Sequence, residues 1–322
     1  MKKTSLACLL LSLLACAWVV HAQDYPNPGK PVRVIVPYVA GGTTDLMART
    51  VAEILREKWG QTAIVENRAG AGGNIGAEAV WRSAPDGYTL LLSAPGPLAV
   101  NKSLYNKLAY DSDSFVPITV VSTSHSVLIV HPKLAADSVP QLIALAKTNP
   151  DKLNYASSGS ASTPQLAAEL FKTLAGVRIA HVPYKGNGPA LTDLVAGHVD
   201  MTFVETSLAL PLIRAGKVRA LGIGSEKRKP FLPDVPTVSE TLPGFISVTW
   251  FGLVAPPKTP PAIANQLSTT IAEGLKQPEI AKRFAAINLE AGGGTPAEMT
   301  TFMKQESERW GNVIRATGMT VE

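Results

Sequence analysis

The groups best suited to chemistry in this sequence lie in three loops rich in glycine, serine and threonine. In the first, residues 37–45, Gly41 and Gly42 let the backbone approach a bound molecule, and Thr43 or Thr44 can cap the helix that follows. Free N–H groups at such a helix start favour an anion. An ordinary turn between a strand and a helix explains the same residues, so this loop alone leaves both interpretations open.

The second loop, residues 157–164, contains four serines and one threonine around an expected helix start. Pro164 suits the first position of a helix, which makes Thr163 the expected N-cap. Hydroxyl and amide donors at a helix start can neutralise a carboxylate without an arginine. A solvated serine-rich loop is the alternative.

The third loop, residues 182–189, offers the polar tips of Tyr184 and Asn187, and Pro189 marks the expected start of the next helix. Lys185 could counter a ligand charge, although a lone loop lysine is usually solvated. Glu205, further along the chain, follows an expected strand. Two roles remain open for it: contact with an amine or hydroxyl of a ligand, or capping of the next helix.

Catalytic and metal-binding patterns are scarce. The histidines beyond residue 22 form neither H-E-x-x-H nor any short metal-ligand spacing, and the serine-rich loop contains no G-x-S-x-G. The glycine-rich loop 69–76 lacks the G-x-G-x-x-G spacing, and no Walker A sequence occurs, so tight backbone packing is its expected role. We therefore expect no enzyme, no metal and no cofactor.

A repeated unit of strand, loop and helix must position these loops. Short apolar runs rich in β-branched residues, each followed by a helix or a loop, are expected at residues 32–36, 63–66, 89–93, 153–156, 179–182 and 201–204. Alternation of this kind predicts parallel sheets with helices on both faces. Open α/β sheets bind ligands at the carboxyl ends of their strands, which is where the three loops lie.

Three longer extended runs break this rhythm: residues 116–130, interrupted at 122–126, then 218–224 and 248–255. Long strands of this kind suit connections that cross between two lobes. The expected fold is therefore α/β with two lobes and a ligand cleft between them. Lobe 1 is expected to contain residues 23–123 and 226–322, and lobe 2 residues 124–225.

The first 22 residues predict a secretory signal peptide. Two lysines precede an apolar run that is short for a membrane span, and small residues favour cleavage after Ala22. A lipobox ending at Cys16, with that cysteine lipidated, is the alternative. Both cysteines of the chain, Cys8 and Cys16, lie in this segment, so a chain cut after Ala22 contains no disulfide.

The remaining chain is weakly charged. Removal of 22 residues from 322 leaves 300, and removal of Lys2 and Lys3 from 30 basic residues leaves 28 against 25 acidic residues. No basic block with interleaved aromatic residues occurs, so we expect no nucleic-acid partner. The length suits two domains of ordinary size, and we expect a monomer.

The chain resembles the receptors of tripartite tricarboxylate transporters, also called Bug receptors, from Pro31 to Trp310. The blocks that carry the resemblance are 38–49, 65–73, 85–89 (Pro-Asp-Gly-Tyr-Thr), 181–186 (His-Val-Pro-Tyr-Lys-Gly) and 234–237 (Asp-Val-Pro-Thr). Several blocks in the right order are more specific than any single motif.

The resemblance implies a type II-like periplasmic binding protein that closes around a small carboxylate and delivers it to transporter subunits in the membrane. It implies that backbone groups and bridging waters hold the carboxylate near the first two loops. The ligand-binding residues expected from the resemblance, together with Glu205, are Tyr38, Ala40, Gly41, Gly42, Thr43, Asp45, Ser157, Ser158, Gly159, Ser162, Thr163, Tyr184, Asn187 and Gly188.

The identity of the ligand stays open at this point. A di- or tricarboxylate, an acidic amino acid and an aromatic acid all present the carboxylate that the loops would bind. Few arginines in these loops argue against a multiply charged tricarboxylate. Trp250 and Tyr38 could stack on an aromatic acid, or both could be packing residues. A sensor that feeds a signalling system is the alternative to a transport receptor, and an α/β enzyme acting on an organic acid is disfavoured.

Overall fold

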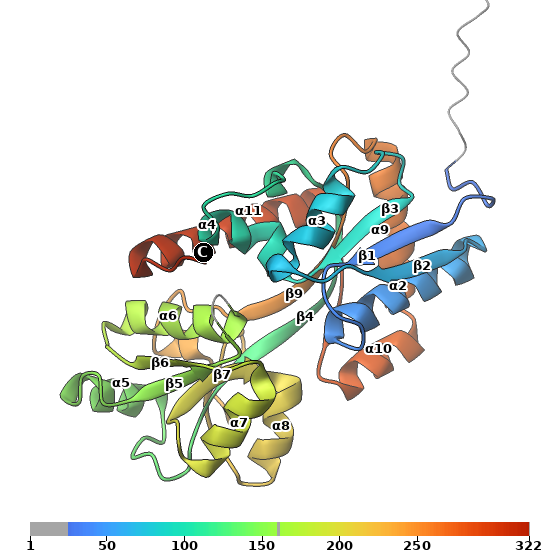
Figure 1. Cartoon of the computed structure of the whole chain (residues 1–322). Coiled ribbons are helices and arrows are strands. Elements are labelled where there is room, and N and C mark those ends of the chain that lie inside the picture. Colours follow the sequence, from blue (N-terminus) through green and yellow to red (C-terminus); the bar gives the residue numbers. More distant parts are fainter. Residues whose placement is uncertain (1–24, 160–161, 322) are drawn as a thin grey trace, which may run out of the picture.

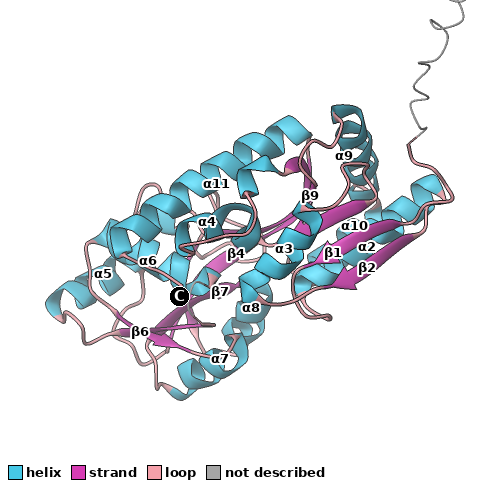
Figure 2. Ribbon diagram, turned by 45° about the horizontal axis from the view of Figure 1, so that its top comes forward, coloured by secondary structure: helices cyan, strands magenta, loops and turns pink. Residues whose placement is uncertain are grey.

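The computed structural model describes residues 25–159 and 162–321. The expected signal peptide and the alternative lipidation at Cys16 lie outside these ranges. Within them the chain forms two α/β lobes joined by long strands, seen from two directions in Figures 1 and 2. The expected α/β fold in two lobes is confirmed. None of the helices in the described ranges combines the length and the apolar character needed to cross a membrane.

One continuous sheet runs through both lobes. Its order is β2-β1-β3-β9-β4-β7-β5-β6, and β8 and β10 also pair with β4. The strands are β1 (Val32–Val36), β2 (Ala63–Asn67), β3 (Thr89–Ser93), β4 (Val116–Val130), β5 (Asn154–Ser157), β6 (Ala180–Pro183), β7 (Met201–Glu205), β8 (Arg219–Ile223), β9 (Val248–Ala255) and β10 (Glu290–Gly293). The strand β10 has no counterpart among the runs expected from the sequence, because its residues, Glu-Ala-Gly-Gly, lack an apolar β-branched pattern.

Helices cover both faces of the sheet in each lobe (Figure 1). Lobe 1 contains α2 (Thr43–Trp59), η1 (Ala71–Gly73), α3 (Asn74–Trp81), η2 (Gly96–Val100), α4 (Asn101–Leu104), η3 (Ser112–Ser114), α9 (Pro261–Leu275), α10 (Pro278–Ala286) and α11 (Pro296–Thr317). Lobe 2 contains α5 (Val139–Thr148), α6 (Thr163–Ala175), α7 (Asn187–Ala196), α8 (Thr206–Arg214) and η4 (Val238–Glu240).

Within each lobe, strands that are joined through a helix pair in parallel. The strands that cross between the lobes pair in the antiparallel direction. β1 pairs in parallel with β2 and β3, and β5 does so with β6 and β7. β4 runs antiparallel to β7, β8, β9 and β10. The expectation of parallel sheets therefore holds for the units that present the loops, and the carboxyl ends of those strands point into the space between the lobes.

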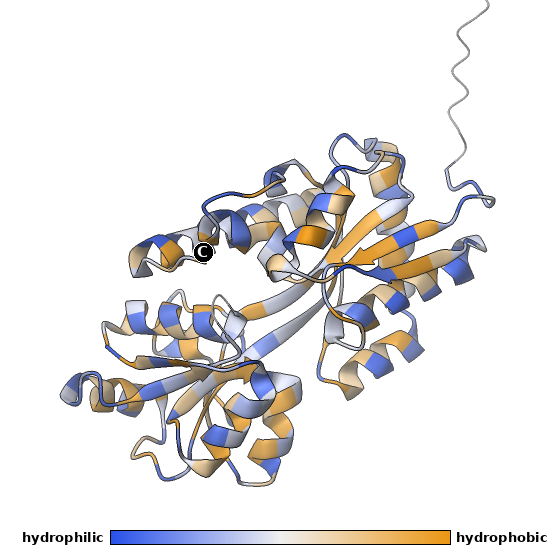
Figure 3. Ribbon diagram, in the orientation of Figure 1, coloured by the Kyte–Doolittle hydropathy of each residue, from blue (hydrophilic) through white to orange (hydrophobic). Residues whose placement is uncertain are grey.

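β4 is a single strand that belongs to both lobes. Its first part, up to His125, pairs with β9, and the part from Ser126 pairs with β7. The expected interruption at residues 122–126 is wrong, because backbone pairing with β9 continues through this polar segment and needs no apolar side chains. In Figure 3 the stretch of β4 between the lobes is pale to blue, whereas the strands inside lobe 1 are mostly orange.

The second crossing between the lobes lies at Ser247. Residues 226–247 pack on lobe 2: Ile223 N–H donates to the Pro236 carbonyl, and the Phe245 ring stacks on Phe203 at 5.3 Å between centroids. Val248 then begins β9, which pairs with β3 and β4 in lobe 1. We therefore propose that lobe 2 extends to about Ser247 rather than to residue 225.

The core of lobe 1 shows why α2 forms where it does. Met47, Val51, Ile54 and Leu55 recur at helical spacing, and each is fully buried against the strands of the sheet. Each such side chain stabilises the fold by about 1.5–3 kcal/mol relative to exposure. The helix ends at Gly60, whose φ of 63° is left-handed and whose N–H donates to the Arg56 carbonyl. This packing fixes the start of α2 at the edge of the inter-lobe space.

Candidate functional site

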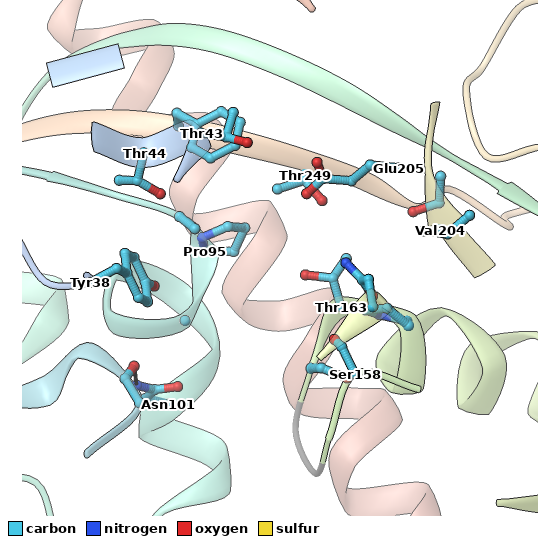
Figure 4. A pocket seen from close by; sticks show the side chains of 18 of the residues that line it. Tyr38, Thr43, Thr44, Pro95, Asn101, Ser158, Thr163, Val204, Glu205 and Thr249 are labelled. Carbon is cyan, nitrogen blue, oxygen red and sulfur yellow. Dashed lines mark hydrogen bonds between the residues drawn. The ribbon is translucent and has the colours of Figure 1, made fainter. Parts of the chain in front are cut away.

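A cavity of about 420 Å³ lies between the two lobes. Figure 4 shows Tyr38, Thr43 and Asn101 of lobe 1 on one side and Ser158 and Thr163 of lobe 2 on the other. Seven residues expected from the sequence line it: Tyr38, Thr43, Ser158, Ser162, Thr163, Asn187 and Glu205. Eight expected residues do not: Ala40, Gly41, Gly42, Asp45, Ser157, Gly159, Tyr184 and Gly188.

Four helices place their N-terminal ends at this cavity. The N-caps of α2, α6, α7 and α8 are Gly42, Ser162, Gly186 and Glu205, and none of them accepts a side-chain cap hydrogen bond. Helices α5 and α11, which begin elsewhere, have such caps, although α9 and α10 do not. The distinguishing feature is thus convergence: four helix starts from both lobes, without a side-chain cap from their N-cap residues, lie at one cavity, and helix starts favour an anion.

The expected cap positions are wrong by one or two residues. Gly42, and not Thr43 or Thr44, is the N-cap of α2, and α7 begins at Asn187, two residues before the expected Pro189. In α6 the N-cap is Ser162 rather than Thr163, and the Ser162 hydroxyl donates to the Gly159 carbonyl at 2.6 Å instead of capping. These shifts leave the hydroxyls of Thr43 and Thr163 at the cavity.

The first loop is held from behind by Asp45. Its carboxylate accepts hydrogen bonds from Gly41 N–H at 3.1 Å and from Arg49 Nε at 2.9 Å, and its side chain is 5% exposed. Burial alone would raise the pKa of Asp45, but the bonds from Arg49 and Gly41 outweigh burial and lower that pKa. Asn67 adds a bond to the Tyr38 carbonyl at 3.1 Å. Asp45 therefore positions the loop and does not face the cavity.

The second loop is closed by a network around Ser157, which is fully buried. Ser157 Oγ lies 2.7 Å from His181 Nε2 and also bonds to Gly159. His181 stacks on Tyr155 at 4.8 Å between ring centroids. Although a serine beside a histidine resembles a nucleophile and its base, a solvent-borne substrate cannot reach this serine in the structure. The network instead shapes the loop so that Ser158 faces the cavity.

In the third loop only Asn187 faces the cavity. The Tyr184 hydroxyl donates to Asp193 Oδ2 of α7 at 2.6 Å, and this bond raises the pKa of Tyr184 to about 12. Gly188 and Lys185 are exposed and do not line the cavity. Tyr184 thus braces the start of α7, and Asn187 is the polar side chain that this loop contributes.

Sequence reasoning missed two groups of lining residues. Ala94, Pro95, Gly96 and Asn101 follow β3, a strand that the sequence predicted without assigning a site to its carboxyl end. These residues could have been predicted, because open α/β sheets bind ligands at the carboxyl ends of their strands. The remaining group includes Ser126 of β4, Thr249 and Phe251 of β9 and Val321, which the pairing of distant segments brings to the cavity.

Loop 69–76 packs as tightly as its glycines suggested. A Cβ at Gly76 would lie 2.8 Å from Pro37 Cβ and 2.9 Å from the Arg68 carbonyl oxygen, so only glycine fits without movement. Gly72 also lines the cavity. Trp250 is fully buried, and its indole N–H donates to Glu306 at 2.9 Å, so it is a packing residue and cannot stack on a ligand.

The cavity contains one formal charge. Its described lining residues include no lysine, arginine or histidine, and Glu205 is the only carboxylic acid among them. Burial raises the pKa of Glu205, and its carboxylate makes no hydrogen bond or ion pair with any other described residue. The remaining polar groups are hydroxyls, amides and backbone N–H groups, which suit the binding of a carboxylate by neutral donors.

The chain is similar to known proteins over most of its length. A family model described as tripartite tricarboxylate transporter family receptor matches residues 47–319. Protein BugT of Bordetella pertussis is 39% identical over 324 residues, which cover 99% of this chain and 99% of BugT.

Two solved structures are similar over nearly their whole length. A Rhodopseudomonas palustris protein with adipate is 38% identical, with a TM-score of 0.78, and the match covers 92% of this chain and 99% of that one. MatC of the same organism, with bound malate, is 32% identical, with a TM-score of 0.74, and the match covers 89% of this chain and 100% of MatC.

Proposed function

The chain belongs to the tripartite tricarboxylate transporter receptor family, and we propose that it captures a small carboxylated solute in the periplasm and delivers it to the membrane subunits of such a transporter. The observation that carries this proposal is the cavity between the lobes, where four helix starts without side-chain caps face one space to which the described residues contribute no cationic side chain. An anionic group is the ligand that such an arrangement favours.

The placement of these helix starts on different lobes suits capture by closure. α2 and the loop after β3 belong to lobe 1, whereas α6, α7 and α8 belong to lobe 2. A carboxylate held by both would draw the lobes together, because the closed state gives it more hydrogen bonds than the open state does. Exclusion of water on closure would strengthen each of those bonds.

Relatives support the chemical class of the ligand. Two of them were solved with adipate and malate, both of which carry carboxylates. The same class fits the neutral donors of the cavity. A tricarboxylate fits less well, because no arginine or lysine of the described lining would balance its charge. Location in the periplasm, cleavage after Ala22 and a monomeric state complete the proposal, with lipidation at Cys16 as the alternative to cleavage.

The experiment that tests the proposal is a thermal-shift screen of residues 23–322 with carboxylic acids and their matched amides. A ligand that binds the native state raises the Tm by mass action, and a 100-fold excess over Kd stabilises by about 2.7 kcal/mol. We expect acids to raise the Tm and their amides to have little effect. A rise with sugars or nucleotides, and with no acid, would contradict a carboxylate receptor.

Transport and sensing need different tests, because both use the same closing cavity. Deletion of the gene should abolish uptake of the bound acid by whole cells and leave induction of transport genes unchanged. Loss of induction with normal uptake would favour the sensor. An enzyme is disfavoured by the burial of Ser157 beneath its loop, and incubation of the protein with the bound acid should return the acid unchanged.

A further inference from the structure

The inter-lobe cavity has two chemically different sides. Glu205 and Thr249 lie on one side of the view in Figure 4 and pair with Ser126 and Ser124 of β4, whereas Asn101 and Ser158 lie on the opposite side. The Ser158 hydroxyl can donate a hydrogen bond, as carboxylate recognition requires, whereas Asn101 Nδ2 already donates to the Gly72 carbonyl at 3.2 Å and to Asn74 Oδ1 at 2.7 Å. Glu205, when ionised, can only accept them.

The Glu205 side of the cavity contains polar atoms that lack partners. Thr249 is 3% exposed, and its Oγ1 has no hydrogen-bond partner among the described residues. The Glu205 carboxylate likewise makes no hydrogen bond or ion pair within the described ranges. Buried polar atoms in folded proteins are nearly always paired, so the unpaired Thr249 hydroxyl, beside a half-buried carboxylate in the same cavity, points to a ligand that pairs with it.

The negative charge of Glu205 indicates which kind of ligand group would bind beside it. A second ligand carboxylate near Glu205 would place two like charges in a site shielded from water, which is unfavourable unless one of them takes up a proton. An ammonium group would have the opposite effect. It would neutralise Glu205 with a charge-assisted hydrogen bond and could donate a further bond to Thr249.

We infer that the ligand, beyond the carboxylate on which the proposed function rests, carries an ammonium group at its other end, which Glu205 and Thr249 bind. The solute class is therefore a zwitterionic amino acid whose amine and carboxylate are well separated. This class differs from the dicarboxylates found with two relatives. Ser158 and the start of α6, which also line the cavity, would hold the carboxylate end of the same molecule.

The test is isothermal titration calorimetry of residues 23–322 at pH 7.5 with two matched sets of probes. The first set is hexanoate, 6-hydroxyhexanoate, 6-aminohexanoate and adipate, which share one chain length and differ at the far end. The second set is 4-methylbenzoate, 4-(aminomethyl)benzoate and terephthalate, which repeats the comparison on a benzene ring. In at least one set we expect the amino acid to bind about tenfold or more tightly than the plain acid and the dicarboxylate.

The decisive variant is Glu205→Gln, which preserves size and removes the charge. It should abolish the preference for the amino acid and strengthen binding of the dicarboxylate. Glu279→Gln is the control, because Glu279 is exposed in the first turn of α10 and does not line the cavity, so its loss changes net charge alone. Equal affinities of the amino acid in wild type and Glu205→Gln would overturn the inference.

The remaining outcomes separate this inference from the proposed function. If plain acids bind and the amine adds nothing, the carboxylate receptor stands and the ammonium site is wrong. If the dicarboxylate binds best in wild type and equally well in Glu205→Gln, the ammonium site is again wrong. If no acid of either set binds, while a neutral compound does, the proposed function fails and this inference fails with it.

Discussion

The hydroxyl of Ser247 donates a hydrogen bond of 2.9 Å to the hydroxyl of Ser126, and this bond joins the two places where the chain crosses between the lobes. The backbone of Gly224 completes the contact, since its N–H donates to the Ser126 carbonyl at 2.7 Å and its carbonyl accepts from Ser247 N–H at 2.9 Å. Ser126 also lines the cavity. The two crossings between the lobes are thus in direct contact with the proposed ligand site.

A side chain at Gly224 should disturb the contact between the two crossings. A Cβ there would lie 2.6 Å from the Ser247 carbonyl oxygen, so Gly224→Ala should lower the free energy of unfolding by about 1–3 kcal/mol, measured by urea denaturation. Gly188→Ala is the control, because its added Cβ meets no atom within 4 Å. Equal stability of the two variants would show that the crossing tolerates a side chain.

Thr249 should respond to substitution differently from a threonine that is hydrogen-bonded. Its hydroxyl has no partner, so Thr249→Val should leave the stability of the unliganded protein unchanged or raise it by up to about 1 kcal/mol. Thr202 is equally buried but donates to the Ala156 carbonyl at 2.8 Å, and Thr202→Val should cost about 1 kcal/mol. Denaturation of the unliganded variants checks both values, and a destabilised Thr249→Val would mean that its hydroxyl has a partner after all.

An acid placed at the start of α6 should compete with the ligand's carboxylate. Ser162→Asp would supply a side-chain cap to the free N–H groups there and should weaken binding of a carboxylate about tenfold or more, measured by calorimetry. Gln277→Asp makes the same change at the N-cap of α10, outside the cavity, and should leave affinity unchanged. Similar affinities in both variants would remove α6 from the site.

Binding of an amino acid should weaken in acid. Burial raises the pKa of Glu205, so this carboxyl takes up a proton at a higher pH than an ordinary glutamate does and then no longer attracts an ammonium group. Burial lowers the pKa of His125, next to Ser126 on β4, so this histidine takes up a proton at a lower pH than an ordinary histidine does. Affinity for 6-aminohexanoate should fall as pH drops from about 7.5 to 5, whereas the affinity of Glu205→Gln should change little.

The raised pKa of Glu205 also predicts how the stability of the unliganded protein depends on pH. Because the folded state raises the pKa of Glu205, the ionised carboxylate destabilises the unliganded protein at pH values above that pKa, and the cost disappears as pH falls through it. Glu205→Gln should therefore melt at a higher temperature than wild type at pH 7.5, and the gap should narrow toward pH 4. A gap that widens in acid would contradict the assigned burial.

The local pattern of residues was sufficient to predict most of the strands and helices. The strands 32–36, 89–93 and 248–255 were predicted with the bounds that the structure shows, because short apolar β-branched runs and their flanking turns depend on neighbouring residues. The helix starts were misplaced by one or two residues, as at Ser162. A cap depends on which hydrogen bonds the folded loop leaves available, and the Ser162 hydroxyl is taken by Gly159.

By itself, the sequence determined that the chain is an α/β protein in which the loops proposed to bind an anion follow parallel strands, and its ordered blocks identified the family. Only the tertiary structure decided which loop residues face the cavity, turning Tyr184 toward Asp193 and Asp45 toward Gly41. It also brought Thr249 and Ser126 to Glu205, since these residues come from strands that pair across long separations in the chain. Such contacts depend on how β4 and β9 cross between the lobes, which no local pattern of residues encodes.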